Sequence, residues 1–175
     1  MGPEQKFGIN SDYSMFDAII LDSDLTKTVP KDQQFHTAMD CYIHCVESIE
    51  GTMINDLSKS YAAKALELCC KSYLEEYDAD KMMVASLFGG VSIVNSEVGI
   101  CHALSYGLSI ELGFRHGIAN CIAFNVLEDY YGKYVDDFRR MINDHGINLP
   151  KNICKWQDEK SLSKMVDMTL KMERA

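Results

Sequence analysis

From residue 31 onward, apolar residues recur in segment after segment at the three- and four-residue spacing of an amphipathic helix. The first such segment carries Tyr42, Ile43, Val46 and Ile49 and stops at Gly51. Segments of similar character cover approximately 56–69, 80–94, 116–131, 134–143 and 161–172. This periodicity predicts a mainly α-helical fold.

One short stretch near the N-terminus has a different character. Residues 18–21 form an apolar run bounded by Asp residues, and Pro30 follows as a stop signal. We expect one or two short strands here, without partners for a full sheet. Residues 1–30 are therefore predicted to be a strand-and-turn segment, and residues 31–175 an all-helical domain.

Composition excludes several classes of function. The net charge is −9 and no cluster of Lys and Arg forms a phosphate-binding stripe, so we expect no nucleic-acid partner. No apolar run approaches the roughly 20 residues that span a bilayer, and the N-terminus lacks a signal-peptide pattern, so we expect no membrane partner. The seven cysteines lie mostly in apolar helical patterns, which indicates free thiols in a reducing cytoplasm.

Asp40 and His44 form the first candidate for chemistry. They are four residues apart in a helical pattern, so both side chains leave one face of the helix and can bind the same ion. Taken alone, the pair is a weak signal, because such a pair more often forms a surface hydrogen bond.

His102 and His116 are the second candidate pair. Along one continuous helix, fourteen residues span about 21 Å, too far for two nitrogens that bind one ion at about 2 Å. They can share an ion only if the chain turns between them, and Gly107 and Gly113 are possible turn points.

These residues lie in two blocks that resemble the iron-containing (group III) alcohol dehydrogenases. Residues 38–47, Ala-Met-Asp-Cys-Tyr-Ile-His-Cys-Val-Glu, are similar to the family's Gly-Met-Asp-Ala-x-x-His-x-x-Glu block. Residues 99–107 and then 115–120, Arg-His-Gly-Ile-Ala-Asn, resemble its His-x13-His block. The resemblance covers roughly residues 6–145.

The resemblance implies the helical metal-binding domain of the dehydroquinate synthase-like fold. The family's four protein ligands would be Asp40, His44, His102 and His116. Their nitrogen and oxygen donors suit Fe(II) or Zn(II). The implied reaction is metal-assisted hydride transfer between an alcohol and NAD(P), in the cytoplasm and by a homodimer when the enzyme is intact.

Two departures from the family pattern matter. Tyr106 stands where many members have a second His near the reacting centre, so its hydroxyl is a candidate proton relay, with an aromatic pocket wall as the alternative. The variant Cys-His-Ala-Leu-Ser-Tyr-Gly is similar to the branch of 3-deoxy-D-manno-octulosonate (Kdo) 8-oxidases of lipopolysaccharide biosynthesis, which oxidise a sugar acid's primary alcohol.

The second departure is that the family's cofactor half, with its glycine-rich phosphate turn, has no counterpart in this sequence. Residues 1–30 would then be the junction with that N-terminal half. The resemblance implies that the chain alone is inactive.

Three alternatives stay open. The domain can be a non-catalytic helical module stabilised by metal, which would close the coordination sphere with protein ligands. It can be a metalloenzyme like dehydroquinate synthase or glycerol dehydrogenase, although Asp40 with His44 favours the alcohol dehydrogenases. A metal-dependent hydrolase ranks last.

Overall fold

The computed structural model describes residues 11, 13 and 16–171, and this part of the chain is mainly helical. A 3-10 turn, η2 (Ser23–Thr26), precedes the helices, and a π-helical turn, η3 (Lys71–Glu75), extends the second one. The α-helices are α1 (Lys31–Glu50), α2 (Asp56–Cys70), α3 (Ala79–Val94), α4 (Ile100–Leu112), α5 (His116–Phe124), α6 (Glu128–Tyr131), α7 (Lys133–His145) and α8 (Glu159–Leu170). The predicted mainly α fold is confirmed.

The strand expected at residues 18–21 was a wrong prediction. These residues are irregular and exposed, and Ile20 retains 90% of its accessible surface. No neighbouring strand in the described part of the chain offers hydrogen bonds, and a lone strand is not stable in water. The rest of the predicted strand-and-turn segment falls partly on residues 1–10, 12, 14 and 15, outside the described residues.

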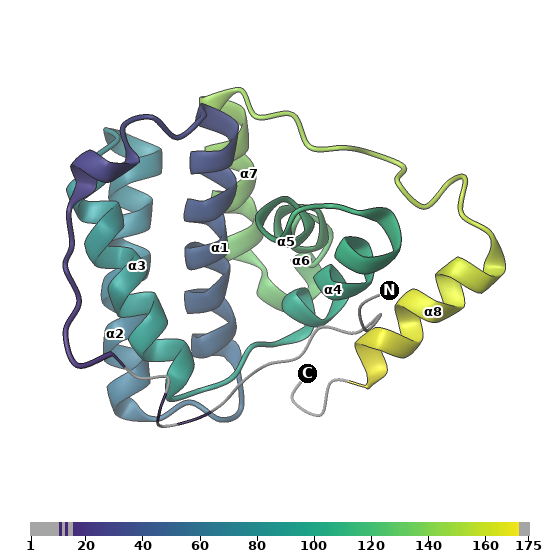
Figure 1. Ribbon diagram of the computed structural model, residues 1–175, viewed down its shortest axis with the longest axis horizontal. Helices are drawn as coiled ribbons and strands as arrows, with labels where there is room; N and C mark the ends of the chain where they lie inside the picture. The colour runs from purple at the N-terminus through teal and green to yellow at the C-terminus, as the bar shows by residue number, and fades with distance from the viewer. Residues whose placement is uncertain (1–10, 12, 14–15, 172–175) are drawn as a thin grey trace.

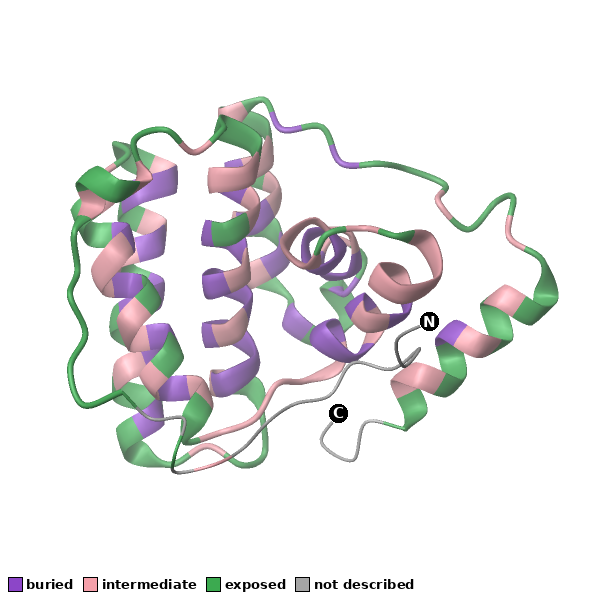
Figure 2. Ribbon diagram, in the orientation of Figure 1, coloured by how far each residue is buried: buried purple, intermediate pink, exposed green. Residues whose placement is uncertain are grey.

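Helix α1 is the central element of the fold. It lies between the antiparallel pair α2 and α3 on one side and α5 with α7 on the other (Figure 1). Phe35, Met39, Tyr42, Ile43 and Val46 are fully buried along it. Figure 2 shows the buried parts of this helix in purple. Burying a large side chain of this kind contributes about 1.5–3 kcal/mol, so α1 organises the core.

Several helices begin at a side chain that accepts the free backbone N–H groups of the first turn. Asn55 accepts from Ser58 at the start of α2, and Asp78 accepts from Lys81 at the start of α3. Such caps stabilise a helix by about 1 kcal/mol and fix where it starts. They explain why α2 and α3 are separate helices rather than one.

The chain reverses between α4 and α5 at only one of the two predicted glycines. Gly113 ends α4 in the left-handed conformation, with φ of 72°. Gly107 instead lies inside α4, where an added Cβ would come within 3.0 Å of Met165 on α8. Gly107 therefore permits close helix packing, and its predicted use as a turn was wrong.

No described helix combines the length and the apolar character needed to cross a bilayer.

Candidate metal centre

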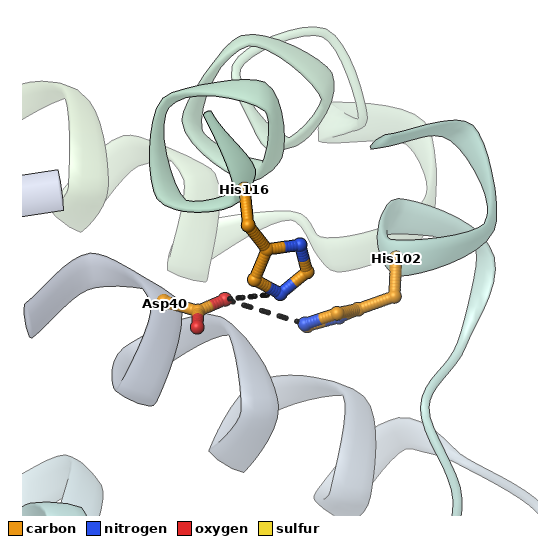
Figure 3. A group of neighbouring side chains, drawn as sticks. All are labelled: Asp40, His102 and His116. Atoms are coloured by element: carbon orange, nitrogen blue, oxygen red, sulfur yellow. Dashed lines mark ion pairs between the residues drawn. The ribbon is translucent and has the colours of Figure 1, made fainter. Parts of the chain in front are cut away.

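Three helices bring Asp40, His102 and His116 together (Figure 3). Asp40 projects from the middle of α1, His102 from the first turn of α4, and His116 is the first residue of α5. Their ligand atoms all lie within 4.8 Å of one another. Because Gly113 turns the chain back, the thirteen residues between the two histidines do not keep the rings apart.

The distances from Asp40 to the two histidines fit adjacent ligands of one ion. Asp40 Oδ1 lies 3.3 Å from His102 Nε2 and 3.5 Å from His116 Nε2. Two ligands that each lie about 2.1 Å from a tetrahedral ion are about 3.4 Å apart. Two imidazole nitrogens and a carboxylate oxygen are donors that iron and zinc accept.

The centre is closed on one side and open on the other. The His102 side chain is 1% exposed, whereas Asp40 and His116 retain 20% and 36%. A site that reaches solvent in this way leaves room for a further, non-protein ligand, which catalytic sites keep and structural sites do not.

The electrostatics of the site favour an ionised Asp40 carboxylate and a protonated His102 ring. Burial acts to raise the pKa of Asp40, but a hydrogen bond to His102 and the nearby histidines outweigh it and hold the pKa well below its usual range. Burial acts to lower the pKa of His102, but the Asp40 and Glu47 carboxylates raise it to about 9. An ion that takes His102 Nε2 must therefore displace a proton.

Glu47 is a buried carboxylate to which the sequence motif assigned no role. It lies seven residues after Asp40 on α1 and is 1% exposed. Its Oε2 is 2.5 Å from His102 Nδ1, and its Oε1 accepts the Cys101 backbone N–H at 2.7 Å and the Tyr131 hydroxyl at 3.1 Å. A carboxylate on Nδ1 fixes the ring and directs Nε2 to the metal, the arrangement common to metal-binding histidines.

His44 lies beside the centre but outside the group of three ligand atoms. It shares the face of α1 that carries Asp40, as its spacing predicted. Its ring stacks on the His102 ring, with 4.3 Å between the two ring centroids. Burial, with the neighbouring His102, lowers its pKa. Its role as the fourth ligand stays a prediction.

Comparisons with known proteins identify the family. The profile described as "Fe-containing alcohol dehydrogenase family, C-terminal" matches residues 34–171. The chain belongs to this family. Among curated relatives, it is 30% identical over 134 residues to a sulfoacetaldehyde reductase of Bilophila wadsworthia, and 29% identical over 111 residues to an NADPH-dependent butanol dehydrogenase of Clostridium saccharobutylicum.

These alignments cover 71% and 61% of this chain but only 35% and 29% of the relatives, so the chain spans a minor part of their length. An iron-containing alcohol dehydrogenase of Thermococcus thioreducens superimposes with a TM-score of 0.67 at 18% identity, over 85% of this chain and 47% of that one. The predicted iron-containing alcohol dehydrogenase fold is confirmed.

Tyr106 lies next to the candidate metal-ligand group. It is one turn after His102 on α4, half-buried, and its ring centroid is 6.2 Å from that of His116. Burial raises the pKa of its hydroxyl, and the Glu47 and Asp40 carboxylates add to the effect, so Tyr106 is protonated at neutral pH. Its catalytic role stays a prediction.

Proposed function

We propose that this domain is the metal-binding half of a metal-dependent alcohol oxidoreductase, with the ion bound by Asp40, His102, His116 and His44 and with one further position left for the substrate oxygen. The convergence of three ligand atoms from three helices carries the proposal, with Asp40 Oδ1 lying 3.3 and 3.5 Å from the two histidine nitrogens. The partial exposure of His116 favours it over a closed structural site.

Within this proposal each residue has a defined task. Fe(II) or Zn(II) bound here would act as a Lewis acid, which favours the ionised form of an alcohol. Glu47 keeps the Nδ1 proton of His102 in place. The Tyr106 hydroxyl donates a hydrogen bond to the substrate oxygen and, in the direction of aldehyde reduction, supplies the proton that this oxygen takes up.

The hydride acceptor is NAD(P), bound by residues outside this domain. The chain corresponds to 35% and 29% of the length of two relatives, one of which is named for its dependence on NADPH. We therefore assign residues 31–175 to the metal-binding domain and residues 1–30 to its junction with a cofactor domain. In isolation, the chain binds metal but does not oxidise alcohols.

The substrate that we propose is a sugar acid with a primary alcohol, such as Kdo. The similarity of residues 101–107, Cys-His-Ala-Leu-Ser-Tyr-Gly, to the Kdo 8-oxidase branch supports it, and this segment carries both His102 and Tyr106. The carboxyl group and hydroxyls of such a substrate need a polar, solvent-accessible site, and Asp40 and His116 are open to solvent.

The first test measures metal after anaerobic purification. We expect about one iron or zinc per chain, lost in the double variant Asp40→Ala/His116→Ala. Asp17→Ala, which removes an exposed carboxylate outside the helices and outside the proposed ligand set, is the matched control and keeps its metal. Equal and negligible metal in all three proteins would contradict the proposal.

A second measurement separates a catalytic from a structural centre. Co(II) replaces the native ion, and its visible absorption spectrum reports the number of ligands. Primary alcohols, and sugar acids more strongly, should change the spectrum because an open position remains. A spectrum that no alcohol alters would indicate a metal-stabilised module instead.

A further inference from the structure

Asn120 is a fully buried amide side chain in contact with every member of the metal-ligand group. It lies on α5 one turn after His116, so the two side chains share a face of that helix. Its Nδ2 donates a short hydrogen bond to Asp40 Oδ1 and lies 3.0 Å from His102 Nε2 and 3.2 Å from His116 Nε2.

The partners of Asp40 make Asn120 distinctive. The other two groups in contact with Asp40 Oδ1 are the nitrogens of His102 and His116. Both become ligands in the proposed centre, so their lone pairs turn to the ion. Among the contacts found for Asp40, the Asn120 amide is then the remaining hydrogen-bond donor.

The orientation of the amide also points to Asp40. Asn120 is 0% exposed, and its Oδ1 is buried without a hydrogen-bond partner. A buried polar atom without a partner is unfavourable, and each such atom calls for an explanation. Here Asp40 Oδ1 needs a hydrogen-bond donor. This explains why the amide NH2 group of Asn120, and not its Oδ1 atom, faces Asp40.

We propose that Asn120 is a positioning residue that holds the Asp40 carboxylate in place for the metal ion. It does for the carboxylate what Glu47 does for His102, since each supports one ligand without binding the ion itself. The Nδ2 atom of Asn120 lies close to all three ligand atoms, so the amide must move aside by a small distance when an ion binds. Because an amide nitrogen is not a metal ligand in its neutral form, Asn120 then acts through its hydrogen bond to Asp40. The inference rests on the proposed metal centre.

Titration of the chain with Co(II) against a competing chelator tests this role. Asn120→Leu keeps the size of the side chain and removes the donor, and we expect Co(II) to bind 10- to 100-fold more weakly. At saturation the absorption bands should match those of the unaltered protein, because the ligands are the same. If the Leu variant does not fold, Asn120→Ala carries the same expectation.

Asn148→Leu, an exposed position outside the helices, is the matched control and should leave Co(II) affinity unchanged. Affinity within twofold of the unaltered chain in a folded Asn120 variant would overturn the inference. Shifted bands at saturation would also overturn it, because Asn120 would then be a ligand. Failure of the unaltered chain itself to bind Co(II) would instead count against the proposed metal centre.

Discussion

At the scale of single residues, the centre is defined by pairs in which one side chain fixes another. Glu47 binds His102 Nδ1 at 2.5 Å, and Asn120 binds Asp40. Both supporting side chains are at most 1% exposed, so water does not compete for these bonds. A hydrogen bond to a charged group in such surroundings is stronger than one at the surface.

Replacing Glu47 tests the first pair. Glu47→Gln keeps the shape of the side chain but removes its charge, so the pKa of His102 should fall from about 9 toward the ordinary histidine value. NMR titration of the imidazole signals measures that fall, and metal affinity should decrease about 10- to 100-fold. Glu159→Gln, exposed at the start of α8, is the control. An unchanged His102 pKa would show that Glu47 does not fix the ring.

The raised pKa of His102 also predicts how metal binding depends on pH. Below a pKa of about 9 the ring carries a proton that the ion must displace, so affinity should increase about tenfold per pH unit and level off above that value. Chelator-competition titrations between pH 6 and about 10 measure the slope. An affinity independent of pH over this range would contradict the protonation assigned to His102.

At the scale of helices, two adjacent glycines of α3 have different surroundings. A Cβ on Gly89 would lie 3.1 and 3.2 Å from the Sγ atoms of Cys41 and Cys45 on α1, whereas nothing lies within 4 Å of one on Gly90. Gly89 thus lets α3 pack closely on the helix that carries Asp40. Gly90 faces solvent.

Alanine at each position tests this difference. Gly90→Ala should raise the free energy of unfolding by up to about 1 kcal/mol, because alanine favours helix. Gly89→Ala should be the less stable of the two variants, since its methyl group crowds two buried sulfur atoms. Urea denaturation compares the two variants. Equal free energies of unfolding would mean that the interface between α1 and α3 accommodates the added methyl group at no cost.

At the scale of the whole molecule, the centre joins segments far apart in the chain. Its proposed ligands come from α1, α4 and α5, so an ion bound there would link the central helix to α4 and α5 (Figure 1). Any ion that binds only the folded chain must stabilise it by mass action.

Thermal unfolding with and without metal measures that linkage. At a free-ion concentration of 100 times the Kd, binding adds about 2.7 kcal/mol to the free energy of unfolding, and the melting temperature should rise accordingly. Asp40→Ala/His116→Ala should show no such rise, whereas Asp17→Ala should behave like the unaltered chain. A rise of the same size in the ligand variant would place the ion elsewhere.

Local sequence determined much of this protein. The helical periodicity from residue 31 gave the fold class, because amphipathic spacing is a property of neighbouring residues. The four-residue spacing of Asp40 and His44 placed both on one face of α1 for the same reason. The strand predicted at residues 18–21 failed because a strand depends on a partner that local sequence does not reveal.

Only the tertiary structure decided how the distant parts meet. That Gly113 turns the chain while Gly107 packs on Met165 depends on where α8 lies. Glu47 and Asn120 are separated by 73 positions in sequence and become supports of one centre only when α1, α4 and α5 pack together. Spacing along the chain therefore supplied candidate ligands, and helix packing selected which atoms face one another, because contacts between helices depend on the whole fold.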